Sequence, residues 1–217
     1  MATRNQFQNE LDLLNEDIIK LANAAGQALD EAIDALFNQD VDLARQVIEN
    51  DKKIDRKELE INDKTILLIA KQQPVATDLR RVITAIKILT DIERMGDNAK
   101  NIAKSTIHLG KNPTAIPADL KKMHKMTKDM LYSATQAFKY EDISVARKLA
   151  DMDDEVDGLY KTIVSELLGE TATHPDKIQY VMQIAFCARY LERFADHITN
   201  VGESILYLVK GENFNLN

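Results

Sequence analysis

The chain has 217 residues, of which 45% are hydrophobic and 29% are charged. This balance is typical of an ordered soluble protein with one or two apolar cores, and it excludes an intrinsically disordered chain. The net charge of -7 argues against binding to nucleic acid or to an anionic membrane surface, because both would repel the protein.

A single cysteine, Cys187, leaves no partner for an internal disulfide bond or a thiolate metal cage. A reducing compartment is the simplest setting for such a chain. The first residues lack the pattern of a signal peptide, and no apolar run reaches the roughly 18 residues that a membrane span needs. We therefore expect a cytoplasmic protein that is neither exported nor embedded in a membrane.

Glycine and proline are scarce, at 7 and 4 residues, whereas helix-favouring residues dominate, which predicts an all-α protein. Apolar periodicity and helix start and stop signals divide the chain into six predicted helices. These helices span residues 5–37, 40–71, 75–109, 117–140, 142–168 and 175–210. We place Pro74 and Pro175 in the first turn of a helix and Gly169 at the end of one.

The two halves of the chain repeat one pattern. At an offset of 102 residues, Asp51 and Asp55 coincide with Asp153 and Asp157. At an offset of 99, the stretch ERMGD that ends at Asp97 coincides with ERFAD in the second half. The offset changes between these blocks, in a loop, where changes of length are tolerated. The repeat predicts two tandem three-helix bundles of long antiparallel helices, over residues 1–110 and 111–217.

Pairs of acids one helical turn apart occur on the second and third helices of each predicted bundle. They border or enter the apolar stripe of their helix, where a carboxylate is costly unless a positive charge meets it. The pairs are Asp51 with Asp55, Glu93 with Asp97, Asp153 with Asp157, and Glu192 with Asp196.

A lone pair of this kind is usually a solvated surface feature, neutralised by a neighbouring arginine. Four pairs at matched positions favour a cation instead. Facing pairs would supply four carboxylates per bundle, a donor set suited to Mg, Mn or iron, with Zn possible. Asn101, Asn200 and Glu203 extend the acidic columns and are weaker candidate ligands.

Catalytic signatures are missing from the sequence. Oxygen-activating di-iron bundles carry Glu-x-x-His motifs, and none of the 4 histidines has a glutamate three residues before it. His197 lies one step off the acidic column, so we expect it on the solvent side or beside the ligands. A non-enzymatic protein is therefore favoured. A carboxylate-bridged metalloenzyme, a metal store and a purely structural helical adaptor stay open as alternatives.

The stretches "TDIERMGDNAKNIAK", "YLERFADHITNVGE" and "PVATDLRRVITAIK" closely resemble the PhoU family of phosphate-specific transport regulators. The resemblance covers essentially the whole chain, including its tandem repeat. It implies a cytoplasmic, commonly dimeric protein whose E/D-x-x-x-D motifs hold metal ions or multinuclear metal clusters. It also implies that the protein links the transporter's ATPase subunit to a membrane sensor histidine kinase and restrains the phosphate-starvation response. Any contact with the membrane would then pass through these partners.

The two repeats differ at the end of their third helices. Lys104 of the first repeat stands opposite Glu203 of the second, each seven residues after an acid of the column. A nearby cation opposes binding of a divalent ion, whereas an extra carboxylate favours it. We therefore expect the second repeat to bind metal more tightly than the first.

Overall fold

The computed structural model describes the backbone of residues 2–216 and the side chains of residues 5–171 and 174–216. The described chain is all-α, as predicted, and contains no strand. Its elements are α1 (Ala2–Asn38), α2 (Val41–Gln72), α3 (Ala76–Leu109), α4 (Asp119–Tyr140), α5 (Ile143–Thr173), the short 3-10 helix η1 (Pro175–Lys177) and α6 (Ile178–Lys210).

The turns that open α2 and α5 show the repeat at atomic detail. Gln39 and Glu141, which precede these helices, have left-handed backbones with φ of 50° and 51°. The next residue in each turn is an aspartate whose side chain accepts hydrogen bonds from the first backbone N–H groups of the helix. Asp40 and Asp142 therefore act as N-caps at positions that the offset of 102 equates.

The predicted end of the fifth helix and the predicted placement of Pro74 are wrong. Helix α5 continues through Gly169 to Thr173, because a glycine within a helix costs only about 1 kcal/mol and breaks no hydrogen bond. His174 is the C-cap residue after the helix, and Pro175, which follows it, disfavours a helical conformation at His174. Pro74 lies in the loop before α3 rather than in its first turn, whereas Pro175 does begin η1.

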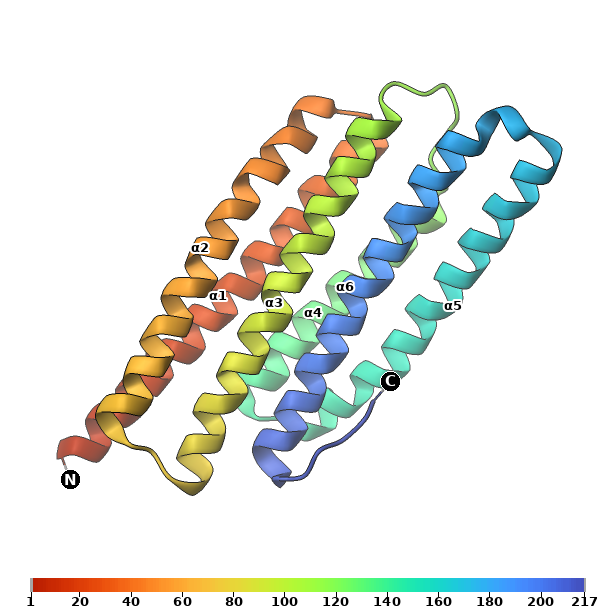
Figure 1. Ribbon diagram of the computed structural model, residues 1–217. Coiled ribbons are helices and arrows are strands. Elements are labelled where there is room, and N and C mark those ends of the chain that lie inside the picture. The colour runs from red at the N-terminus through yellow and green to blue at the C-terminus, as the bar shows by residue number, and fades with distance from the viewer. Residues whose placement is uncertain (1, 217) are drawn as a thin grey trace.

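The helices form two three-helix bundles, α1–α3 and α4–α6, and the chain reverses its direction at each connection (Figure 1). The bundles are not separate: α3 packs more extensively against α6 than against either neighbour in its own bundle. A single apolar cluster runs through both repeats. The proposed boundary at residue 110 stays a prediction, and the outer limits at residues 1 and 217 lie outside the described range.

Carboxylates form several of the polar links between the bundles, and one of them joins Arg81 of α3 to Glu141 at the end of α4. Asp30 on α1 accepts a 2.5 Å hydrogen bond from Lys128 Nζ on α4 and lies 2.8 Å from His124 Nε2. Asp91 on α3 accepts a 3.1 Å hydrogen bond from the side-chain amide of Asn200 on α6. These contacts fix the register of the two repeats along their common interface.

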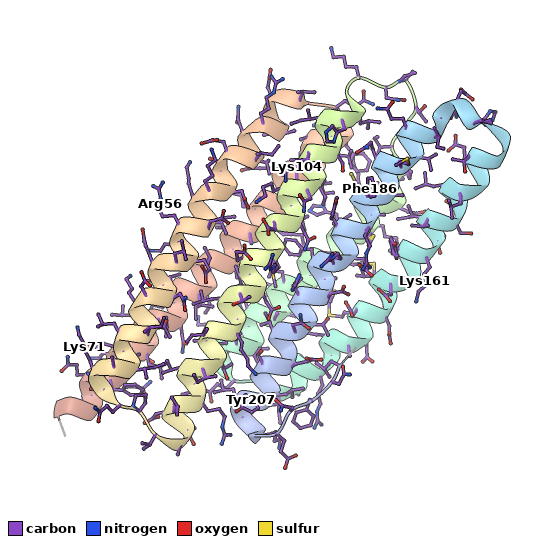
Figure 2. The ribbon with its side chains drawn as sticks, viewed as in Figure 1. Arg56, Lys71, Lys104, Lys161, Phe186 and Tyr207 are labelled. Carbon is purple, nitrogen blue, oxygen red and sulfur yellow. The ribbon has the colours of Figure 1, made fainter. Side chains whose placement is uncertain are left out.

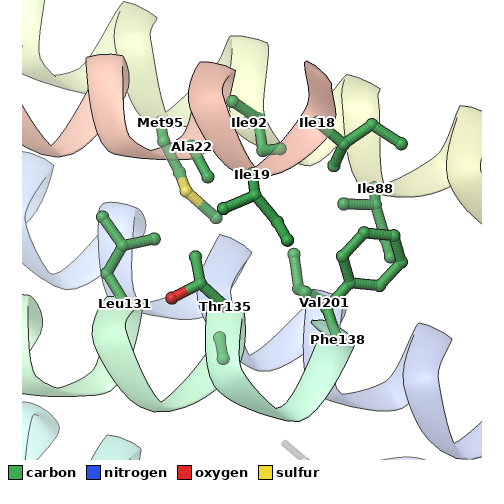
Figure 3. A pocket seen from close by; sticks show the side chains of 11 residues that line it. Ile18, Ile19, Ala22, Ile88, Ile92, Met95, Leu131, Thr135, Phe138 and Val201 are labelled. Carbon is green, nitrogen blue, oxygen red and sulfur yellow. The ribbon is translucent and has the colours of Figure 1, made fainter. Parts of the chain in front are cut away.

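Where α1, α3, α4 and α6 meet, the core encloses a cavity of about 20 Å³ (Figure 3). Its lining is aliphatic and aromatic apart from Thr135. Sites for small molecules have volumes of roughly 300–1,000 Å³, so this cavity is a packing defect and not a ligand site. Within the described residues, no helix is long and apolar enough to cross a membrane.

The N-caps are expected to contribute to stability in both repeats. Asp40→Ala and Asp142→Ala should each lower the free energy of unfolding by about 1 kcal/mol, because each leaves backbone N–H groups without an acceptor. Urea unfolding of the variants measures the loss. Glu166→Ala, which removes an exposed acid from the interior of α5, is the control, and losses no larger than its own would contradict the capping role.

Candidate metal centre

The predicted acids gather in two clusters, each between the second and third helices of a repeat. We call Asp51 and Asp55 of α2 with Glu93 and Asp97 of α3 the first cluster. The second cluster joins two acids of α5 to two of α6, and consists of Asp153, Asp157, Glu192 and Asp196.

The second cluster has the geometry of a site for a cation. One carboxylate oxygen from each of Asp157, Glu192 and Asp196 lies within 4.8 Å of the other two. Among the described residues, this is the only such group of three acidic, histidine or cysteine side chains. Asp153 lies one turn from Asp157 and close enough to Asp196 to be repelled by it. The four acids that the repeat predicted are thus neighbours in space.

Two acids of the second cluster are almost fully buried and incompletely paired. Asp153 is 9% exposed and Glu192 is 8% exposed. Asp153 Oδ1 and Glu192 Oε2 are inaccessible to solvent and have no hydrogen-bond partner. An unpaired oxygen in such a position is costly. Each of these two oxygens therefore lacks a partner, which a bound cation could supply.

The same burial shifts the acidity of this cluster. Burial, followed by repulsion from Asp196 and Asp157, raises the pKa of Asp153 to about 6. Burial and the neighbouring Asp196 raise the pKa of Glu192 to about 7, against the opposing charge of Arg189. Without a cation, the carboxylates resist carrying their full negative charge at neutral pH.

The two positive side chains that form ion pairs with the second cluster in the described structure lie at its rim. Arg189, whose side chain is 45% exposed, donates a hydrogen bond to Glu192 Oε1. Lys161 Nζ lies 3.5 Å from an oxygen of Asp157, but its side chain is largely exposed (Figure 2). Neither cation reaches the oxygens of Asp153.

The first cluster contains a lysine at its centre. Lys100 Nζ donates hydrogen bonds of 2.5 Å to Asp51 Oδ2 on α2 and to Asp97 Oδ1 on α3. Arg94 approaches Glu93 and Asp97 from outside, at 3.4 and 3.5 Å. Desolvation alone would lower the pKa of Lys100, but the hydrogen bonds to both aspartates raise it above its usual value. The ammonium group is therefore charged and fixed between the helices.

Asp55 and Glu93 complete the first cluster. Burial raises the pKa of both carboxyls, and repulsion from Asp51 and from Asp97 respectively adds to the shift. Asp51 and Asp55 each keep one inaccessible oxygen without a hydrogen-bond partner. Lys100 thus neutralises part of the negative charge of the cluster, and two of its carboxylate oxygens stay without a hydrogen-bond partner.

The weaker candidate ligands have other partners. Lys104 Nζ donates a 3.2 Å hydrogen bond to Asn101 Oδ1, on the exposed side of α3 (Figure 2). Asn200 donates to Asp91, and Glu203 Oε1 accepts a 2.8 Å bond from the backbone N–H of Leu216. Glu203 does not belong to the group of three converging acids, and the role of all three candidates as ligands stays a prediction.

His197 is not on the solvent side, which was one of its two expected positions. Its Nδ1 lies 3.0 Å from Asp91 Oδ1, and both side chains are largely buried between α3 and α6. The residue therefore faces the interface of the two repeats instead of solvent, next to Asp196 in the chain.

Sequence reasoning missed Lys100 and Arg189, although the repeat contains the signal. At the offset of 99, Lys100 coincides with Thr199, and Arg189 coincides with Thr90. Lys100 also lies three residues after Asp97, which places it on the same side of α3. A search of the aligned repeats for unmatched charges would have found both.

The donor chemistry fits a hard cation in one cluster better than in the other. The second cluster offers oxygens only, converging from two helices, as Mg, Mn and iron sites require, with Zn also possible. In the first cluster an ammonium group already lies between the acids, and no three of them converge in the described structure.

Comparison with known proteins gives a consistent result. The family model of the PhoU domain matches residues 18–106 and again residues 120–205. The phosphate-specific transport system accessory protein PhoU homolog of Clostridium acetobutylicum is 37% identical over 217 residues, or 99% of each chain. PhoU of Escherichia coli is 34% identical over 96% of this chain and 87% of its own length.

Among solved structures, the phosphate transport system regulatory protein PhoU of Streptococcus pneumoniae superposes with a TM-score of 0.89. It is 31% identical in sequence, and the match covers 96% of this chain and 99% of the other. The likeness therefore extends over both bundles and their relative placement.

The buried acids predict how stability depends on pH when metal is removed. The ordinary pKa values of Asp153 and Glu192 are 3.8 and 4.5, and folding raises them to about 6 and about 7. The native state then binds more protons than the unfolded state between these limits. Their stabilising contribution is complete below about pH 4 and is lost as the pH rises through about 7.

Glu192→Gln isolates this effect, because glutamine keeps the acceptor for Arg189 but does not ionise. In chelator, the variant should gain stability relative to the wild type by on the order of 1–3 kcal/mol from about pH 5 to about pH 8. Denaturant unfolding at both pH values measures the difference. A difference that does not change with pH would contradict the raised pKa.

Proposed function

The chain belongs to the PhoU family, and on this premise we propose that it is a metal-binding cytoplasmic regulator of phosphate uptake. The curated relatives are named as accessory proteins of phosphate-specific transport, and the solved relative as a regulatory protein. A regulatory role in phosphate transport follows from membership. The proposal adds that the protein binds metal and that it is not an enzyme.

The proposed partners come from the family resemblance. They are the ATPase subunit of a phosphate ABC transporter and a sensor histidine kinase, which the protein would link as a homodimer. When phosphate is plentiful, this link would keep the kinase from activating the phosphate-starvation response. The net charge of -7 supports partners that are proteins, since nucleic acid and anionic lipid would be repelled.

The second acid cluster is the observation that supports metal binding. Its converging oxygens and its two buried, unpartnered atoms would hold a divalent ion through Asp153 and Asp157 of α5 and Glu192 and Asp196 of α6. The ion would supply positive charge, which removes the repulsion between these acids. In the protein itself, the apolar core packs α5 against α6, and Arg189 donates a hydrogen bond that holds Glu192 in place.

Metal removal should destabilise the protein. A ligand that binds only the native state stabilises it by mass action, so the melting temperature should fall in chelator and recover when Mn, iron, Mg or Zn is restored. Asp153→Asn and Glu192→Gln should retain helix content but bind less metal and lose most of this response. Glu166→Gln, at an exposed position of α5, is the matched control.

Elemental analysis of protein purified without chelator identifies the ion and its amount. An unchanged melting temperature in chelator, with no metal in the purified protein, would disprove a metal site coupled to folding. The regulatory role could still hold in that case, because it depends on a separate observation.

Loss of the gene should switch on phosphate-starvation genes in medium rich in phosphate, because the restraint on the kinase is removed. A reporter of the starvation response measures this, and expression of the wild-type chain should restore repression. The strain must contain no second copy of the family. Normal reporter output in the deletion strain would contradict the proposed regulation.

A further inference from the structure

The two acid clusters contain equivalent carboxylates but differ at one internal position. The offset of 99 that aligns Glu93 with Glu192 and Asp97 with Asp196 also aligns Lys100 with Thr199. Lys100 contributes a positive charge to the first cluster, whereas Thr199 contributes a hydroxyl group to the second. The difference lies within the cluster and not at its edge.

The lysine ammonium makes the contacts that a cation between the helices would make. It bridges α2 and α3 through Asp51 and Asp97, at 2.5 Å from each. The bond to Asp51 is well protected, since Asp51 is 3% exposed and the side chain of Lys100 is 20% exposed. An ammonium group so placed repels a divalent ion that approaches the same oxygens.

Thr199 leaves the second cluster without an internal cation. Its hydroxyl group donates to the carbonyl of Ala195 within α6. Asp153 Oδ1 and Glu192 Oε2 are buried without a partner, as are Asp51 Oδ1 and Asp55 Oδ1 in the first cluster. Among the described residues, however, three acids converge only in the second cluster. A positive charge is therefore missing in the second repeat at the place where the first repeat has one.

We propose that Lys100 takes the place of a metal ion in the first cluster, so that the chain binds metal in its second repeat only. The inference deepens the proposed metal-binding function and rests on it for the second repeat. The first repeat then holds its second and third helices together permanently. In the second repeat the apolar core packs α5 against α6, and their acids are linked to one another only when a metal ion is bound.

Arg189 does not play the equivalent role in the second repeat. It contacts one oxygen of Glu192 from an exposed position and lies over the ring of Tyr160 on α5, but it pairs with no acid of α5 among the described residues. Lys104, which coincides with Glu203 of the other repeat, donates a hydrogen bond to Asn101 on its own helix. Of these three cations, only Lys100 joins acids from two helices.

The test replaces the lysine with the residue of the other repeat. Lys100→Thr should create a second site, so that the metal content per chain about doubles, because the two carboxylate sets are then alike. Anomalous diffraction should show metal in the second cluster alone in the wild type and in both clusters of the variant. Lys104→Thr, which removes an equal charge seven residues after Asp97, should leave both readouts at the wild-type value.

The melting temperature with and without metal distinguishes the proposed role of Lys100 from a purely structural one. In chelator, Lys100→Thr should melt below the wild type, and added divalent ion should raise its melting temperature by more than that of the wild type. Lys100→Met keeps the aliphatic stem and should show the same response to metal. It serves as the second variant if the threonine variant folds poorly.

The outcomes separate this inference from the proposed function. Metal in both clusters of the wild type would overturn the inference and leave the proposed function intact. A wild type without metal would contradict metal binding in the second repeat. Lys100→Thr and Lys100→Met would still test the role of Lys100. If the first cluster of these variants takes up metal, Lys100 excludes metal from the wild-type cluster. If it takes up none, that exclusion is disproved.

Discussion

Repulsion between carboxylates of neighbouring helices is the constraint on which this structure depends. Each repeat places two acids on its second helix against two on its third, in positions that burial makes expensive. The apolar core holds the helices at a distance where these acids must be neutralised. The first repeat supplies a lysine for this purpose. The second supplies only a partial rim of positive charge, and this difference leads to the proposed metal centre.

Much of the fold follows from local patterns that the sequence contains twice. The six helices and the two capped turns at Asp40 and Asp142 depend on residues close together in the chain. The dominant contact between α3 and α6 could not be predicted in this way. Both helices are apolar over a wide arc, and a single sequence does not reveal which part of the arc meets its own bundle and which meets the other.

For the candidate site, the spacing of the acids predicts that they lie in pairs, because residues four apart share one side of a helix. The role of the eight acids as metal ligands stays a prediction. The cations were harder to place. Lys104 differs visibly between the repeats, yet it lies on the exposed side of α3 and touches no acid. In the sequence, Lys100 lies three residues after Asp97, which is the spacing of an ordinary surface ion pair on one helix. Its reach to Asp51 on another helix depends on the packing of α2 against α3, which is a tertiary property.

Asp91 has a mechanical consequence. Its carboxylate lies on α3, but both His197 and Asn200 of α6 contact it, and His197 directly follows Asp196 of the second cluster. Helix α6 therefore cannot turn about its axis without straining a link to the first repeat. Since Lys100 braces that repeat from within, it gives α6 a support that does not depend on metal. A displacement that begins at the acids of α6 would thus be felt along α3, which packs on the side of α6 opposite α5 (Figure 1).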